Sequence, residues 1–408
     1  MKRSLQVLVG LCLVSGLLAL AVAGCGSSSP ATGSGGGSGS DSSTATASGS
    51  DSSTTTTDSE SGLTPADTAL ATRQGREAGE QVAGGKPVAL APKTVSFLNF
   101  TSEAGAVRRS LAGIEAAAET IGWKFATCDA QGSTQQVAIC ASRLLQQNVD
   151  LVDEVAIAPS LVTPEMKEAK AKGVPWINSG GGMEPSPLFA GNIFYPEAKD
   201  TASVNKVFIE AVGEPAEIGT VEYAAISNTR ERGEQLAREL ESHPGIEVVD
   251  SVEGSQTEIG AVTPAIVAML QQHPNIKGIW SCCDIFNTPI VQAIHQLGLT
   301  GEKKPVVTGP FPDTSTLQAI REGDILAMND LPWEAYGWIA VDEAAQFYAH
   351  GTPFTKFGPP TQYPEKLYAS QVVTQENVVQ DPEALQPPAY DYEAYFKAKW
   401  KAEFEGVE

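Results

Sequence analysis

Four histidines are the side chains of this 408-residue sequence best suited to acid–base chemistry or to zinc binding. None of them belongs to an HExxH pair or lies beside a GxSxG nucleophile, the spacings that place a histidine next to a metal or a serine. His243 and His273 each precede a proline, and His350 precedes a glycine at the end of a predicted helix. Carboxylates are numerous, but no motif singles out a pair of them. The sequence therefore indicates no catalytic residue, no metal site and no cofactor, and a secreted hydrolase is the less favoured interpretation.

Two pairs of cysteines could carry redox chemistry. Cys128 ends a predicted strand, and Cys140 lies one to two turns into the next predicted helix. A disulfide between them would close a short loop and stabilise the fold by ~2–3 kcal/mol; the alternative is two buried free thiols. Cys282 and Cys283 are adjacent, so they could form a strained vicinal disulfide that offers a ligand a flat apolar surface. Alternatively, their thiols point to opposite faces of a strand end.

The elements that would position these residues alternate between strand and helix along two stretches of the chain. Short apolar runs are separated by segments whose apolar residues recur every three or four positions. This alternation predicts an α/β fold with parallel sheets and right-handed crossovers, and such sheets bind ligands at the carboxyl ends of their strands. The predicted strands are 94–100, 123–127, 151–158, 174–178, 217–223, 246–252, 277–281, 305–309 and 325–329, and the predicted helices are 107–121, 133–147, 163–172, 201–212, 227–241, 259–269, 284–297 and 315–322.

The amino-terminal residues indicate export. Met1-Lys2-Arg3 precedes an apolar run that ends in small residues, which is typical of a secretory signal peptide, here over 1–24. The segment Val22-Ala23-Gly24-Cys25 resembles the bacterial lipobox, which implies cleavage before Cys25 and a lipid on its sulfur. An uncleaved membrane span is the alternative. We therefore expect an extracytoplasmic protein that is anchored to the cell membrane through Cys25.

The next residues predict a tether and a short helix. Residues 25–62 are almost entirely Gly, Ser, Thr, Asp and Ala, a composition typical of a flexible linker. Within 63–92, Thr64 and Pro65 predict the start of a helix that reaches about Val82. The formal net charge of −22 argues against nucleic acid as a partner, because an acidic surface repels phosphates.

Several short motifs carry a resemblance to one family. DAQGS at 129–133, LLQQNVD at 144–150 and AKAKGVP at 169–175 resemble the sugar-type, ribose-binding-like periplasmic binding proteins of ABC importers. The resemblance continues through RERGE at 230–234 and DLPWE at 330–334, and it covers roughly 93–373. The order and spacing of the motifs make the resemblance specific.

The resemblance implies a type I periplasmic binding protein fold, with two doubly wound parallel-sheet lobes joined by a three-segment hinge. The implied boundaries are 93–196 plus 331–358 for lobe 1, 197–330 plus 359–378 for lobe 2, and 379–408 for a C-terminal tail with a helix over 390–404. The chain would re-enter lobe 1 with a helix over 334–350 and lobe 2 with a strand over 366–373. Three crossings make a hinge about which the lobes can close on a ligand.

The same resemblance places ligand contacts at the strand ends of lobe 1. The matching positions here are Phe100, Thr101, Glu103 and Ser179. The sequence departs from the family nearby, because Ala106 and Val107 stand where the family has an aromatic pair and Gly180-Gly181 replace an Asp–Arg pair. These departures widen the range of ligands beyond ordinary pentoses and hexoses.

Further ligand contacts are implied in lobe 2 and at the hinge. The matching positions are Arg230, Arg232, Cys283, Asp284, Asp330 and Trp333. Each has a purely structural alternative. The arginines could pair with Glu231 or Glu234 at the surface, Asp284 could act only as a helix N-cap, Asp330 could be a turn residue, and Trp333 could belong to the core.

Sequence and resemblance together predict a monomeric solute-binding lipoprotein that captures a small polar, sugar-like molecule and delivers it to an ABC permease. A nucleoside or a furanose signal is an alternative ligand. A sensory receptor that presents its ligand to a chemoreceptor or a sensor kinase is an alternative role. A LacI-type regulator shares the fold, but it would need an N-terminal DNA-binding helix pair that we do not find in this sequence.

Overall fold

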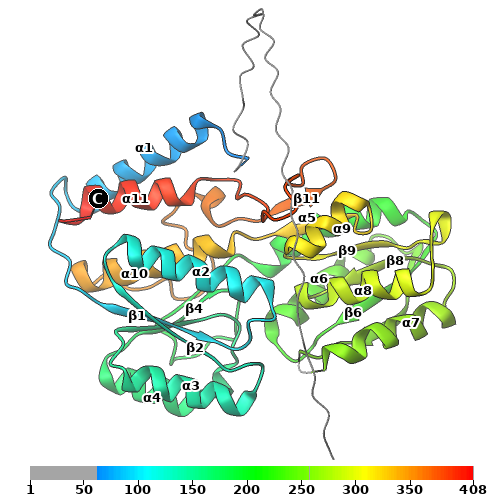
Figure 1. The fold of residues 1–408 in the computed structure, drawn as a ribbon, viewed down its shortest axis with the longest axis horizontal. Coiled ribbons are helices and arrows are strands. Elements are labelled where there is room, and N and C mark those ends of the chain that lie inside the picture. Colours follow the sequence, from blue (N-terminus) through cyan, green and yellow to red (C-terminus); the bar gives the residue numbers. More distant parts are fainter. Residues whose placement is uncertain (1–61, 257, 408) are drawn as a thin grey trace, which may run out of the picture. The chain divides into compact units, whose positions relative to one another are not determined.

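Residues 62–256 and 258–407 are described by the computed structural model in Figure 1. The predicted signal peptide, Cys25 and nearly all of the predicted linker lie outside these residues. Within them, the strands form one sheet of five strands and one of six, and each sheet is the centre of a lobe.

Lobe 1 is built on a parallel sheet with the strand order β2-β1-β3-β4-β5. Its strands are β1 (Thr94–Asn99), β2 (Lys124–Asp129), β3 (Leu151–Glu154), β4 (Trp176–Gly180) and β5 (Gly191–Phe194). β1 is buried from its second residue to its last, because helices cover both faces of the sheet.

Helices from distant parts of the chain cover this sheet. They are α2 (Gly105–Thr120), α3 (Thr134–Gln146), α4 (Thr163–Lys172) and α10 (Trp333–His350). α2 and α10 pack together on one face, and α3 and α4 cover the other (Figure 1). The α2–α10 contact needs glycine on both sides, since a Cβ at Gly113 would lie 2.2 Å from the Glu334 carbonyl oxygen and one at Gly337 would lie 2.2 Å from the Ile114 nitrogen.

Lobe 2 has the strand order β11-β10-β9-β8-β6-β7. The strands are β6 (Ala216–Glu222), β7 (Ile246–Glu253), β8 (Ile276–Ser281), β9 (Val306–Pro310), β10 (Ala327–Asp330) and β11 (Gln371–Thr374). The helices are α5 (Glu197–Val212), α6 (Ser227–Leu240), α7 (Val262–Gln272), α8 (Asp284–Gln296) and α9 (Thr314–Glu322). All pairings are parallel except that between β10 and β11, which is antiparallel.

Three chain segments connect the lobes. They run from β5 to α5, from β10 to α10 and from α10 to β11. The predicted fold class, two doubly wound lobes joined by a three-segment hinge, is therefore present. Several predicted bounds differ, and the strand predicted over 151–158 already ends at Glu154 as β3. β5 was not predicted from the sequence, and the strand predicted over 366–373 is a short 3-10 helix, η4 (Glu365–Leu367), followed by the four-residue β11. The other 3-10 helices are η1 (Pro159–Leu161), η2 (Ile259–Ala261) and η3 (Gly301–Lys303).

Two helices at the ends of the described chain pack on lobe 1. Figure 1 shows α1 (Pro65–Val82) beside α11 (Tyr392–Glu403), and α11 in turn contacts α10. The α1 backbone approaches α11 so closely that a Cβ at Gly75 would lie 2.0 Å from the Tyr395 carbonyl oxygen. On the other side of α11, the rings of Trp400 and Trp338 stack with centroids 5.2 Å apart. Among the described residues, no helix combines the length and apolarity that a membrane crossing requires.

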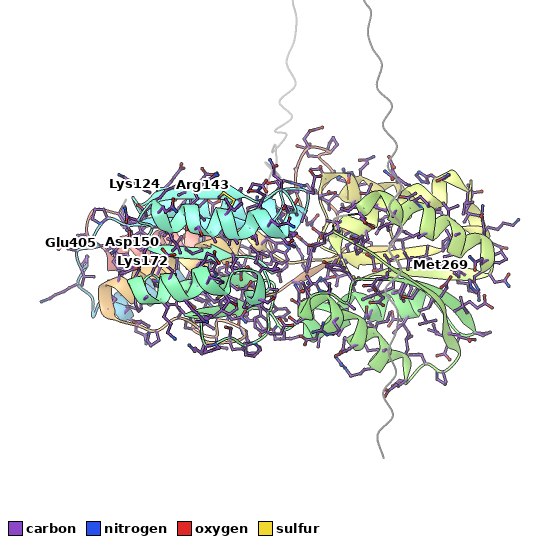
Figure 2. The ribbon with its side chains drawn as sticks, turned by 90° about the horizontal axis from the view of Figure 1, so that it is seen from below. Lys124, Arg143, Asp150, Lys172, Met269 and Glu405 are labelled. Carbon is purple, nitrogen blue, oxygen red and sulfur yellow. A yellow bond between two sulfur atoms is a disulfide. The ribbon has the colours of Figure 1, made fainter. Side chains whose placement is uncertain are left out.

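Lobe 1 also holds a disulfide. Cys128 at the end of β2 is bonded to Cys140 in α3, which is the pairing proposed from the sequence. Arg143, labelled in Figure 2, lies beside it, with its Nη1 3.8 Å from Cys128 Sγ. The bridge fixes α3 to the strand that precedes it.

Candidate functional site

The two lobes touch through residues that follow the carboxyl ends of their strands, and we call this set of contacts the lobe junction. Lobe 1 contributes Ala106, Gly180, Gly181, Gly182 and Glu184; lobe 2 contributes Glu197, Asn228, Arg230, Arg232, Asp284 and Phe311; the hinge segment contributes Asp330 and Trp333. In doubly wound sheets this is the edge where ligands bind. The junction is therefore the candidate ligand site.

Asp284 reaches from lobe 2 to the start of a lobe-1 helix. It is the first residue of α8, and its Oδ2 accepts a hydrogen bond from the Ala106 nitrogen of α2 at 3.3 Å. α2 has no side-chain cap of its own, so Asp284 supplies one from the other lobe. Burial raises the pKa of Asp284, and the backbone N–H groups of Ala106 and Ile285 counteract that rise. The expectation that Asp284 only caps its own helix is wrong, because Cys283 holds the N-cap position.

Arg232 is buried and paired within lobe 2. Its Nε donates to Glu197 Oε2 at 2.8 Å, and its Nη1 donates to the Cys282 carbonyl oxygen at 2.9 Å. Glu197 Oε1 accepts from the Gly182 nitrogen of lobe 1 at 3.2 Å, so the pair also holds the lobes together. Burial raises the pKa of Glu197 to about 7, although Arg232 acts to lower it.

Asp330 is held by an arginine from lobe 1 that was not predicted from the sequence. Arg109 of α2 donates to Asp330 Oδ1 at 2.5 Å and forms a two-point contact with Glu334, at 2.8 and 3.0 Å. Burial raises the pKa of Asp330 to about 6, while Arg109 lowers it. Asp330 was predicted to contact ligand; the structure places it in a buried ion cluster across the hinge.

Trp333 and Phe311 form the aromatic part of the junction. Their rings meet edge to face with centroids 4.8 Å apart, and the Arg232 guanidinium lies 4.7 Å from the Phe311 centroid. Phe311 has a left-handed backbone (φ 55°), a conformation that costs a bulky residue energy and is often found at functional sites. Trp333 is buried, and its Nε1 has no hydrogen-bond partner among the described residues.

Gly180 and Gly181, which stand where the resemblance implies an Asp–Arg pair, make room for these side chains. A Cβ at Gly180, whose φ is 111°, would lie 2.5 Å from the Trp333 ring. A Cβ at Gly181 would lie 3.0 Å from Asn228 Nδ2 of lobe 2. Any larger residue at Gly180 would have to displace the tryptophan. The tryptophan and the glycines therefore depend on each other, which the sequence alone did not show.

The remaining predicted positions are spread around the junction. Ser179 is buried and donates to Asp153 Oδ2 at 2.7 Å within lobe 1. Phe100 packs against the core under α3 and α4, and the Thr101 hydroxyl accepts from the Glu103 nitrogen at 3.2 Å. Arg230 is 45% exposed and approaches Glu184 of lobe 1 at 3.5 Å. These contacts place Arg230 at the rim of the junction and Ser179 inside lobe 1.

Cys282 and Cys283 follow β8 and are free in the structure. Both are buried, and their sulfur atoms lie 3.1 Å apart without a bond. The structure therefore does not contain the predicted vicinal disulfide, nor do the thiols point to opposite faces of the strand end. In the described part of the chain, no group of three or more His, Cys, Asp or Glu side chains is arranged to hold a metal ion.

Sequence reasoning missed Arg109, which pairs with Asp330 of the junction, and two residues of the junction itself, Glu197 and Phe311. A signal was available for the first, because Arg109 falls on the same face of its helix as apolar residues three and four positions away. A charged residue on an apolar face requires a buried partner. The partner itself, Asp330, is 221 positions away in the sequence, so the sequence alone could not identify it as the partner of Arg109.

Comparison with known proteins agrees with this architecture. A family model described as periplasmic binding protein domain matches residues 95–352. The xylitol-binding protein of Mycolicibacterium smegmatis is 24% identical over 206 residues, which is 50% of this chain and 56% of that protein. The D-ribose/D-allose-binding protein of Pseudomonas aeruginosa is 23% identical over 216 residues, 51% of this chain and 67% of that protein.

A solved structure shares the fold. The 5-methylthioribose transporter solute binding protein of Thermotoga lettingae, determined with 5-methylthioribose, superposes with a TM-score of 0.64 at 18% identity, covering 76% of this chain and 98% of that one. The family's members act outside the cytoplasm. The match does not include α1 or α11, which precede and follow residues 95–352. The chain belongs to the periplasmic binding protein domain family.

Proposed function

We propose that this protein is an extracytoplasmic solute-binding lipoprotein that captures a small polar ligand, a sugar or a sugar-like molecule, at the lobe junction. A lipid on Cys25 anchors it, it works as a monomer, and it delivers its ligand to an ABC permease. It binds its ligand without converting it. The names of its relatives support this class, since they bind xylitol, ribose or allose, and 5-methylthioribose.

The observation that carries the proposal is the meeting of two strand-end edges at a junction with two aromatic rings, together with buried, unpartnered polar atoms in the junction and at strand or helix ends of the two lobes. Sugars and polyols need an apolar surface against their C–H faces and hydrogen bonds for their hydroxyls. Trp333 and Phe311 supply rings. Trp333 Nε1, Asn99 Oδ1 at the end of β1 and Ser227 Oγ at the start of α6 are buried polar atoms without partners among the described residues.

Hinge motion would convert these contacts into capture. A ligand that touches both lobes makes all of its contacts when the lobes are together, so binding favours the closed arrangement. The hydrogen bond from the Gly182 nitrogen to Glu197 and the contact of Asp284 with Ala106 would then be re-formed at each closure. Because Arg109 and Arg232 are each paired with buried carboxylates, the junction offers no free arginine charge at those positions, which favours a neutral ligand.

A thermal-shift panel tests the proposal. Xylitol, D-ribose, D-allose, 5-methylthioribose and a nucleoside are each added to the purified protein, with glutamate as a charged control. A true ligand at 100 times its Kd stabilises the folded state by about 2.7 kcal/mol. We expect a neutral polyol or sugar to raise the Tm and to be recovered unchanged by NMR. A panel in which no sugar or polyol acts, or in which the added solute is converted, contradicts the proposal.

A further inference from the structure

The adjacent thiols of Cys282 and Cys283 have no part in the ligand capture proposed above. They are the free cysteines of the described residues, they are 0% and 4% exposed, and their sulfur atoms are 3.1 Å apart. Elsewhere in the same chain, Cys128 and Cys140 are bonded. A pair of thiols at this separation in a protein that carries a disulfide is positioned for oxidation.

The peptide group between these two cysteines adjoins two residues of the lobe junction, Arg232 and Asp284. Its carbonyl, that of Cys282, accepts the Arg232 hydrogen bond at 2.9 Å, and its N–H, that of Cys283, donates to Ser281 Oγ at 3.4 Å. Cys283 is also the N-cap of α8, so the next residue is Asp284, which caps α2 in lobe 1. The position of Arg232 within lobe 2 and the contact of Asp284 with lobe 1 therefore both depend on the orientation of one peptide group.

We propose that Cys282 and Cys283 form a redox-active dithiol, oxidised by a low-molecular-weight disulfide to a vicinal disulfide, and that this oxidation lowers the affinity of the lobe junction for its ligand. The effect on ligand affinity rests on the proposed function; the dithiol chemistry does not.

The reaction balances as two thiol–disulfide exchanges. The Cys283 thiolate attacks one sulfur of the donor disulfide, which forms a mixed disulfide and releases the first donor thiol. The Cys282 sulfur then attacks the Cys283 sulfur, which closes the vicinal bond and releases the second donor thiol. Two electrons and two protons pass to the donor. Burial raises the pKa of the Cys282 thiol well above its usual value, which makes Cys282 a poor first nucleophile, so we assign it the second step, in which the sulfur that it attacks is held next to it.

The covalent geometry explains why the change would reach the ligand site and be reversible. Adjacent Cα atoms are about 3.8 Å apart, whereas ordinary disulfides span roughly 4.4–6.8 Å between Cα atoms. The intervening peptide group must therefore reorient to close the ring. That movement withdraws the Cys282 carbonyl from Arg232 and shifts the start of α8 beneath Asp284. Strained disulfides are also the easily reduced ones, so a dithiol reductant would restore the thiols.

Access to the dithiol requires movement within lobe 2. Both sulfurs are buried in the hydrophobic core of that lobe, together with Val221 and Phe286. A reagent would therefore reach them when the start of α8 moves away from this core.

Peptide-mapping mass spectrometry tests the chemistry directly. The full chain is incubated with glutathione disulfide, the remaining thiols are blocked with N-ethylmaleimide, and the peptide containing 282–283 is analysed. We expect loss of two hydrogen atoms without a retained glutathione, reversed by dithiothreitol. Cys282→Ser should instead retain a glutathione adduct on Cys283, because no resolving thiol remains. Two thiols that still react with N-ethylmaleimide after oxidation, or a stable adduct on the wild type, would overturn the dithiol.

Control variants and a binding measurement separate the two parts of the inference. A Cys128→Ser/Cys140→Ser variant should still oxidise at 282–283. With xylitol, or whichever solute the panel identifies, the oxidised protein should bind on the order of tenfold more weakly than the reduced protein, as expected when a charge-assisted hydrogen bond is lost. Equal affinities would overturn the switch. A panel without any binder would count against the proposed function, while the mass measurement would still decide the chemistry.

Discussion

Arg109 Nη1 lies 2.5 Å from Asp330 Oδ1, and this ion pair joins a helix of lobe 1 to the last residue of a strand in lobe 2. Both side chains are buried, and Glu334 at the start of α10 completes the cluster. The pair lies at the point where the chain crosses from β10 to α10. It ties the hinge to the α2–α10 face of lobe 1.

Removing Arg109 should destabilise the fold strongly. Arg109→Ala leaves two carboxylates facing each other in a buried site, which typically costs about 3–5 kcal/mol. Denaturant unfolding measures the loss. Arg108→Ala is the matched control, because Arg108 is the preceding residue, is exposed and donates to backbone carbonyls of the loop before α2. The two variants should differ by several kcal/mol; equal free energies of unfolding would contradict the buried cluster.

Stability should fall as the pH rises towards neutrality. Glu343 in α10 is buried, and burial raises its pKa from 4.5 to about 7, although Thr355 and Gln362 donate hydrogen bonds to it. Between these values the folded state keeps a proton that the unfolded state releases, so the contribution is present below pH 4.5 and is lost as the pH rises through 7.

The free energies of unfolding at pH 5 and pH 8 measure this effect. Replacing Glu343 by Gln should remove a pH-dependent loss on the order of 3 kcal/mol, whereas Glu376→Gln, at an exposed position, should leave it intact. The raised pKa values of Glu197 and Asp330 act in the same direction. A wild-type protein that is more stable at pH 8 than at pH 5 would contradict the assignment.

The packing of α1 on α11 should not tolerate a single methyl group. A Cβ at Gly79 would lie 2.3 Å from the Lys399 carbonyl oxygen. Gly→Ala in a helix is otherwise favourable by about 1 kcal/mol, so the sign of the effect is informative. We expect Gly79→Ala to cost roughly 1–3 kcal/mol and to speed proteolysis of α1. Gly260→Ala, where nothing lies within 4 Å of the added Cβ, should be neutral. A stabilising Gly79→Ala would show that the helices do not pack this way.

The indole nitrogen of Trp333 should contribute to ligand affinity. Trp333→Phe keeps an aromatic ring and removes the unpartnered buried N–H, so binding should weaken by roughly tenfold if that N–H donates to the ligand. Trp123→Phe is a matched control, because Trp123 Nε1 is also buried without a partner but lies in lobe 1 against Tyr348. Calorimetric titration compares the two. Equal losses would place the ligand elsewhere.

The fold was largely predictable from the sequence because burial of strands and helix faces requires apolar residues at regular spacings, and these spacings recur along the chain. β1 and α2 follow this pattern closely. β5 shows no such apolar pattern, because its four residues, GNIF, include a glycine and an asparagine. It also lies at the edge of the sheet. The strand predicted over 366–373 was too long because it joined two neighbouring segments. Glu365–Leu367 is a 3-10 helix, and only β11 pairs with β10.

The site was less predictable because its partners are distant in sequence. Arg230 and Arg232 look equivalent in RERGE, yet residues two apart on a helix point to different faces, so one is 45% exposed and the other 4%. Asp330 was placed at the hinge correctly, but its partner Arg109 comes from a helix 221 positions earlier. The motifs named these positions, and the packing shows what each side chain contacts.

Closure of the two lobes on an unconverted ligand is measured most directly by small-angle X-ray scattering with the solute that the thermal-shift panel identifies. The radius of gyration should fall when that solute is added, and the solute should be recovered chemically unchanged. An unchanged radius of gyration at saturating solute, or a converted solute, would contradict a receptor that works by closing its lobe junction.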